Sequence, residues 1–103
     1  ILIVENNGAI ANMQDDAMVE VVCELGINGP RPMSVGNIPQ FYLGLLVQQV
    51  SCEKLLVDAY YEHSYQKALE AFTLNRLIND AKVARKILDA LIEANKGMWP
   101  ELK

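Results

Sequence analysis

The sequence has 103 residues, of which 51% are hydrophobic and 21% are charged, a balance typical of one folded domain rather than of a disordered chain. Its 9 Lys and Arg residues are outnumbered by 13 Asp and Glu residues, for a net charge of −4. Because no basic run interrupts this excess of acid, the sequence favours neither a nucleic-acid binder nor a protein that docks on anionic lipid.

Cysteine usage and the chain's first residue bear on where the protein works. A secreted disulfide framework would need more cysteines than Cys23 and Cys52, so we expect two reduced thiols in a cytoplasmic protein. The apolar runs are too short to span a bilayer and none has the pattern of a signal peptide, so no membrane association is expected. The chain begins with Ile1 rather than Met, and we expect a piece of a longer chain.

The first part of the chain predicts short β-strands. The β-branched run 1–4 (ILIV) is typical of a strand. In 17–25 (AMVEVVCEL) the residues alternate with a period of two, which predicts a second strand with one buried face and two acids on the other. The residues expected on the buried face are Val19, Val21, Cys23 and Leu25.

A hairpin is expected next. The Asn28-Gly29 step is a strong turn signal, and the run 33–35 (MSV) is expected to supply the second strand. Pro30 and Pro32 cannot donate a hydrogen bond to a ladder, so this strand should lie at an edge or start only after Pro32.

From residue 37 onward the sequence predicts helices. The first should run from about 41 to 61, with Asn37 as its cap and Pro39 in its first turn. Apolar residues cover most of its circumference, so we expect it to be buried on most sides, either centrally or against another subunit. Ser64 should cap a second helix that ends near residue 72 or 73.

A third helix is expected from about 80 to 96, with Asn79 or Asp80 near its cap and Lys96 in its last turn. Its expected apolar stripe consists of Val83, Ile87, Leu88, Leu91 and Ile92. The fold class is therefore α+β, with short antiparallel strands or a hairpin followed by three helices.

Few residues point to chemistry. His63 is the only histidine, and on a continuous helix it would lie roughly 16 Å from Cys52, too far to share a metal. Both cysteines sit in apolar patterns without a basic neighbour, which favours buried, inert thiols. The sequence therefore shows no complete catalytic or metal site.

Four acids, Asp15, Asp16, Glu20 and Glu24, invite comparison with the paired carboxylates of many glycosidases. Adjacent aspartates at a turn more often cap or solvate it, and Glu20 and Glu24 alternate as the outer face of a strand would. A structural role is the favoured interpretation.

The segment 5–16 (ENNGAIANMQDD) carries a more specific pattern. Together with the following residues it resembles the C-terminal portion of glycoside hydrolase family 4, whose chains carry a similar N-x-G-A-I-x-N-L-P-x-D-x-x-V-E-V-P segment. Met13-Gln14 replace the usual Leu-Pro, and Val22 replaces the last Pro. The matching residues are Asn7, Gly8, Ala9, Ile10, Asn12, Asp16, Val19, Glu20 and Val21.

Further segments, QQVSCEKLLVDA, SYQKALEAFTLN and ILDALIEANKGMWPELK, resemble the 6-phospho-α-glucosidase branch, the maltose-6-phosphate hydrolases. A fainter likeness to the C-terminal half of lactate and malate dehydrogenases agrees with the shared architecture of these families.

The resemblance implies a parent enzyme that needs NAD and Mn²⁺ and acts on a phosphorylated disaccharide by redox elimination. A hydride passes from C3 of the sugar to NAD⁺, the C2 proton is removed by a tyrosine base, and the aglycone leaves from C1; water and the returning hydride complete hydrolysis. The family's metal-binding Cys and His, its Tyr base and its dinucleotide glycines lie upstream of residue 1. Residues 1–103 would be a C-terminal substrate and oligomerisation domain without its NAD-binding Rossmann domain, inactive alone, from a dimer or tetramer.

Within that resemblance, Asn6 and Asn7 are the residues expected near the substrate. Either can turn the chain or bind sugar hydroxyls, and the favoured interpretation is a structural joint beside the cleft. Two other classes stay open: a non-catalytic interaction or oligomerisation module, and the C-terminal half of a 2-hydroxy acid dehydrogenase relative.

Overall fold

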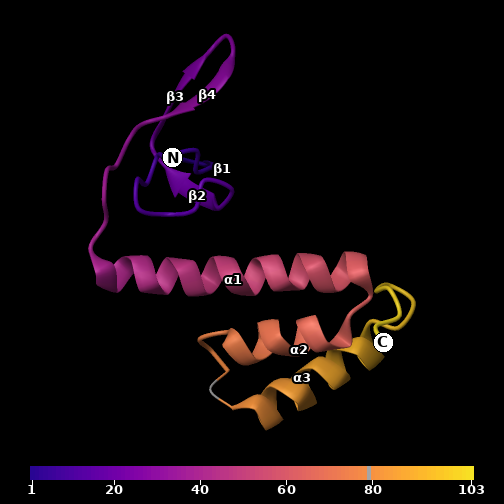
Figure 1. Cartoon of the computed structure of the whole chain (residues 1–103). Helices are drawn as coiled ribbons and strands as arrows, with labels where there is room; N and C mark the ends of the chain where they lie inside the picture. The colour runs from indigo at the N-terminus through magenta and orange to yellow at the C-terminus, as the bar shows by residue number, and fades with distance from the viewer. Residues whose placement is uncertain (79) are drawn as a thin grey trace. The chain divides into compact units, whose positions relative to one another are not determined.

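The computed structural model describes residues 1–78 and 80–103, with four short β-strands followed by three α-helices (Figure 1). The chain divides into two compact units, Ile1–Val47 and Gln48–Lys103, and helix α1 (Gln40–Glu62) contributes to both. The predicted α+β class is confirmed. Asn79, one of the two residues expected to cap the last helix, lies outside the described residues.

The first sheet pairs β1 (Leu2–Glu5) with β2 (Met18–Val21) in antiparallel orientation. Val4 lies opposite Val19, and Val19 and Val21 are buried while Met18 and Glu20 are exposed. The period of two predicted this burial correctly, because alternate side chains of a strand point to opposite faces.

The predicted strand 17–25 is two strands. It is interrupted at Val22, and β3 (Cys23–Gly26) belongs to a second two-stranded sheet with β4 (Gly29–Pro32). Leu25, expected on the buried face, has 76% of its surface exposed. The alternation continues in the sequence, but the buried face ends with the first sheet.

The partner of β3 is Gly29–Pro32, so the expectation that 33–35 forms this strand is wrong. The amide of Met33 donates to the Val22 carbonyl at 2.9 Å. Bonded and non-bonded pairs alternate along an antiparallel ladder, which places Pro32 and Pro30 at positions where no N–H is needed. The prolines are therefore compatible with the hairpin.

Helix α1 begins later than its expected cap. The Pro39 carbonyl accepts the first helical bond, from the Leu43 amide at 3.1 Å, so Pro39 stands just before the helix. The prediction of Asn37 as cap is wrong, because the chain before α1 is held elsewhere: the side chain of Asn12 both donates to and accepts from the Ile38 backbone, each at 3.0 Å.

Burial of α1 is lower than expected. Val50, Cys52 and Ala59 are its buried residues, so burial on most sides within this chain is wrong. Its exposed large apolar residues are Phe41, Tyr42, Leu46, Leu56, Val57, Tyr60 and Tyr61. Cover by another subunit stays a prediction.

In the second unit α2 (Tyr65–Leu74) runs antiparallel to the end of α1. Ser64 is its cap, as predicted, and accepts from the Lys67 amide at 3.3 Å. At the other end of α2 the Gln48 side-chain amide donates to the Leu74 carbonyl at 2.9 Å.

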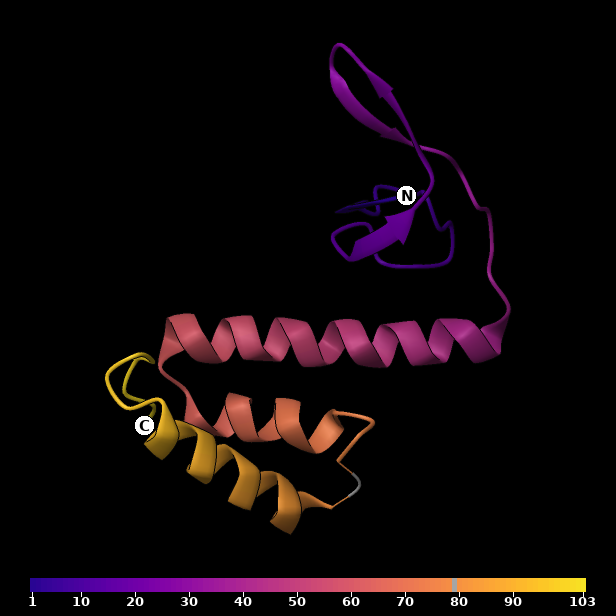
Figure 2. The ribbon, with the colours of Figure 1, turned by 180° about the vertical axis from the view of Figure 1, so that it is seen from behind.

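Helix α3 (Ala81–Ala94) lies beside α2 (Figure 2). Asp80 caps it as predicted, accepting from the amides of Lys82 and Val83 at 2.7 and 3.0 Å. The helix ends two residues before the expected Lys96, because Asn95 takes the C-terminal cap position. No described helix is both long and apolar enough to cross a membrane.

The core of the second unit is small and centred on Leu88. The predicted apolar stripe of α3 divides: Leu88 is fully buried, whereas Val83, Ile87 and Leu91 are exposed. The buried centre consists of Ala59, Ala68 and Leu88, and around it pack Tyr65, Leu69, Phe72, Ile92 and Leu102. Small alanines on α1 and α2 let the helices approach Leu88 closely.

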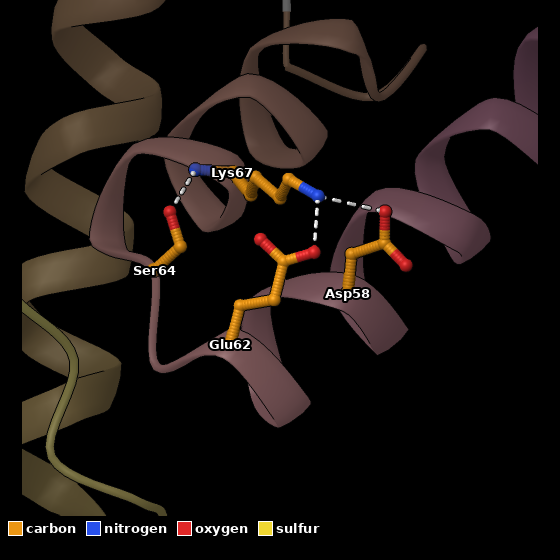
Figure 3. A network of polar contacts seen from close by, with 4 residues as sticks. All are labelled: Asp58, Glu62, Ser64 and Lys67. Carbon is orange, nitrogen blue, oxygen red and sulfur yellow. Dashed lines mark hydrogen bonds and ion pairs between the residues drawn. The ribbon is translucent and has the colours of Figure 1, made fainter.

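A charged network joins α1 to α2. The ammonium of Lys67 lies 2.7 Å from a carboxylate oxygen of Glu62 and 2.9 Å from one of Asp58 (Figure 3). The hydrogen bond to Glu62, followed by the one to Asp58, raises the pKa of Lys67 above its ordinary 10.5. Since the folded state has the higher pKa, this stabilisation is complete below that ordinary value and is lost as the pH rises through the raised one.

We therefore expect Lys67→Met to lower the melting temperature slightly at neutral pH. The melting temperature of the variant should also fall less than that of the wild type as the pH rises beyond 10.5. Both differences should shrink at high salt, because the pair is exposed. Melting temperatures from neutral pH to beyond 10.5 measure this, with Lys82→Met as a matched control on α3. Coincident curves for wild type and Lys67→Met would show that the network contributes nothing.

Candidate functional site

The segment 5–16 begins with a tight turn at Asn6–Ala9. Asn7 has φ 40° and Gly8 has φ 81°, and the Ala9 amide donates to the Asn6 carbonyl at 2.7 Å. Two successive positive φ values define a type I′ turn, which Asn-Gly pairs favour because both residues tolerate this conformation.

Asn6 is completely buried, and its side chain holds the loop together. Its amide nitrogen lies 3.1 Å from the Ile10 carbonyl, 3.2 Å from that of Met13 and 3.1 Å from that of Gln14. Its amide oxygen accepts from the Ile10 backbone N–H at 2.7 Å. The side chain is therefore committed to the loop's own backbone on both its donor and its acceptor side.

Asn7 is the exposed member of the pair. Its backbone N–H donates to the Asp15 carbonyl at 2.9 Å, and its side-chain amide donates to Glu5 at 3.2 Å. These contacts support the interpretation of residues 5–16 as a structural joint, that is, a loop held in shape by hydrogen bonds to its own backbone. Proximity of Asn6 and Asn7 to a substrate stays a prediction, and Asn7 is the one that has an accessible side chain.

The joint also holds the chain that leads to α1. Ile10 and Gly36 form a parallel bridge, in which the Ala11 amide donates to Gly36 at 2.9 Å and the Val35 amide donates to Ala9 at 2.7 Å. Asn12 adds its two bonds to Ile38. The sequence analysis did not predict this role of Asn12. The available signal was a single polar residue between Ala11 and Met13, within the segment that resembles the family 4 pattern.

The four acids have the structural placement that the sequence favoured. Glu20 is exposed on β2, and Glu24 pairs with Arg31 across the second hairpin. Over residues 1–78 and 80–103, no three or more His, Cys, Asp or Glu side chains gather as they would around a metal ion. Asp15 and Asp16 are exposed in the turn before β2, as the structural interpretation expects.

His63 lies in the turn just after α1, with φ 57°. Its ring Nδ1 is 3.2 Å from the Glu101 carbonyl, and its own carbonyl accepts from the Lys103 amide at 2.8 Å. The last residue also accepts from the Tyr65 amide at 3.0 Å, so His63 anchors the end of the chain at the α1–α2 turn.

Both cysteines are free thiols, Cys52 buried and Cys23 half-buried. Burial, and next the negative charge of Glu53, raise the pKa of the Cys52 thiol, so less of it is in the reactive thiolate form.

We expect iodoacetamide to label Cys23 first and Cys52 only after the helices open. Peptide mass spectrometry with and without urea tests this; equal native rates would contradict it.

Residues 1–78 match the family described as "Family 4 glycosyl hydrolase C-terminal domain". The chain belongs to glycosyl hydrolase family 4.

Among its family 4 relatives, maltose-6'-phosphate glucosidase of Bacillus subtilis is 59% identical over 99% of this chain, and that of Fusobacterium mortiferum is 57% identical over 100%. A crystal structure of a 6-phospho-alpha-glucosidase from gut microorganisms, in complex with NAD and Mn2+, is 90% identical, covers 98% of this chain and superposes with a TM-score of 0.95. The structure of the 6-phospho-beta glucosidase from Thermotoga maritima, 29% identical over 100% of this chain and 25% of that one, has a TM-score of 0.89.

This family 4 chain spans 23% of the length of both bacterial glucosidases and of the gut-microorganism enzyme. The described residues do not by themselves form a manganese or NAD site. The described side chains form no His, Cys, Asp or Glu cluster, and Gly26 and Gly29 close a β-hairpin rather than a strand-to-helix turn. The chemistry of such groups therefore cannot be assigned to residues of this chain.

Proposed function

We propose that this chain is the C-terminal part of an NAD- and Mn²⁺-dependent 6-phospho-α-glucosidase. Its substrates would be phosphorylated disaccharides of the maltose 6-phosphate type. The observation that carries the proposal is the gradient of identity: 59% and 58% to maltose-6'-phosphate and 6-phospho-alpha-glucosidases, against 43% and 31% to two 6-phospho-beta-glucosidases. The gradient favours the α branch.

Within that enzyme we propose that residues 1–103 form a substrate and oligomerisation domain of a cytoplasmic homodimer or homotetramer. The exposed apolar residues of α1, such as Phe41 and Val57, support a subunit contact. Asn6 would hold the loop 5–16 in shape, and Asn7 would lie beside the sugar. The isolated chain would be inactive, since its described residues form no cofactor or metal site.

The test is an assay of the full-length protein on 4-nitrophenyl 6-phospho-α-glucoside and on its β anomer, with NAD⁺ and Mn²⁺. We expect hydrolysis of the α anomer, loss on addition of EDTA, and no turnover of the unphosphorylated glucoside. Residues 1–103 alone serve as the inactive control. Preference for the β anomer, or activity of the isolated chain, would contradict the proposal.

The reaction type has its own test. Redox elimination removes the C2 proton, so hydrolysis in D₂O should leave deuterium at C2 of glucose 6-phosphate. A two-carboxylate hydrolysis leaves that C–H bond intact. Absence of deuterium at C2 in a fully active preparation would contradict the redox mechanism while leaving the substrate class unaffected.

A further inference from the structure

The chain contains two asparagines followed by glycine, Asn7-Gly8 and Asn28-Gly29. In such a pair the backbone nitrogen of glycine can attack the asparagine side chain, because no Cβ hinders its approach. We propose that Asn28 is a deamidation site and that the fold protects Asn7 from the same reaction. The two steps have the same local chemistry, so their difference lies in the structure around them.

The reaction at Asn28 needs only water. The Gly29 nitrogen, after losing its proton to solvent, forms a bond to the side-chain carbonyl carbon of Asn28, and the bond from that carbon to the amide nitrogen breaks. Ammonia leaves with the proton it gains, and a cyclic succinimide remains. Water then opens the ring at either carbonyl, giving an aspartyl or an isoaspartyl linkage. The balance is asparagine plus water to aspartate plus ammonia.

Asn28 lies at the tip of the β3–β4 hairpin, where the chain is open to solvent. It is exposed, and its neighbour Ile27 is 102% exposed. Its side chain makes no hydrogen bond to any of the described residues. Gly26 and Gly29 are the closing pair, and within residues 1–78 and 80–103 no third strand joins this sheet. The end of a two-stranded hairpin opens at low free-energy cost, so Asn28 and the Gly29 nitrogen can reach the geometry of attack.

Asn7 is exposed, but hydrogen bonds hold both its side chain and its backbone. Its side-chain amide donates to Glu5, its backbone N–H donates to Asp15, and its turn is closed by the bond from Ala9 to Asn6. Forming the ring requires rotation about the Asn7 backbone, which would break these bonds. The fully buried Asn6 beside it fixes the loop on which they depend. Attack at Asn7 therefore has to await opening of the whole joint.

Deamidation would change the hairpin as well as its charge. The new carboxylate would stand at the tip of the strands that carry the Glu24–Arg31 pair. The isoaspartyl form also inserts a methylene into the backbone, which the short turn between Gly26 and Gly29 cannot accommodate in the same register.

The experiment incubates the full-length protein at mildly alkaline pH and follows both peptides by mass spectrometry, with isoaspartyl methyltransferase to mark the isomer. We expect conversion at Asn28 to be several-fold faster than at Asn7 in the native protein, and the two rates to converge in urea. Asn28→Gln should remove the fast conversion while the slow one at Asn7 persists. Equal native rates, a faster Asn7, or a difference that survives in urea would overturn the proposal.

Discussion

Asn6→Asp is expected to destabilise the first unit by at least about 3 kcal/mol, although the two side chains have nearly the same size. The amide nitrogen of buried Asn6 lies within hydrogen-bond distance of three carbonyls, those of Ile10, Met13 and Gln14, which share its two hydrogens. A carboxylate in its place has no hydrogen to donate and sets negative charge against three carbonyl oxygens. The loss comes from polarity rather than from a cavity, because the side-chain shape is kept.

Amide hydrogen exchange measures this effect locally, which is preferable because a protein with more than one compact unit need not unfold in a single two-state step. Protection should fall at the amides of Ala9 and Ile10. The first donates to the backbone carbonyl of Asn6 and the second to its side-chain oxygen. Asn12→Asp is the matched control, since Asn12 is exposed and makes one donor bond, to Ile38. If both variants lose the same protection, Asn6 is not the centre of the loop.

How far the sequence predicts this fold depends on the range of the interactions involved. Ser64 and Asp80 act within three residues of themselves; Ser64 was predicted as a cap, and Asp80 was one of the two residues expected near the cap of α3. The alternation of β2 is equally local. Asn37 failed as a cap because the chain before α1 is positioned by Asn12, whose bonds to Ile38 span 26 residues. A local pattern contains no information on such a contact.

The candidate site follows the same division. The Asn7-Gly8 pair and its turn could be predicted from local chemistry, and the structure gives it positive φ values at both residues. The hydrogen bonds from the Asn6 side chain to the Met13 and Gln14 carbonyls could not be predicted, since they depend on how the loop closes. Function was predicted from resemblance rather than from paired acids or thiols, because the sequence shows no complete catalytic or metal site.

Leu88→Ala is expected to destabilise the second unit by about 2–5 kcal/mol, the range for truncating a fully buried leucine. Leu88 is 0% exposed at the centre of the core, between Ala59 and Ala68. Alanines cannot move inward to refill the space, and the helices would have to shift. The cost should therefore lie in the upper part of that range, since it rises with the volume left empty.

Leu77→Ala is the matched control, the same truncation at a residue with 92% of its surface exposed, and it should change stability by less than about 0.5 kcal/mol. Amide exchange of α3 residues in the full-length protein reports both variants on the same unit. A loss at Leu77 as large as at Leu88 would mean that Leu77 is covered in the full-length protein by a segment outside residues 1–103. A small loss at Leu88 would instead show that α3 is held chiefly by its caps and polar contacts, such as the 2.7 Å bond from the Tyr65 hydroxyl to Asp89, rather than by this core.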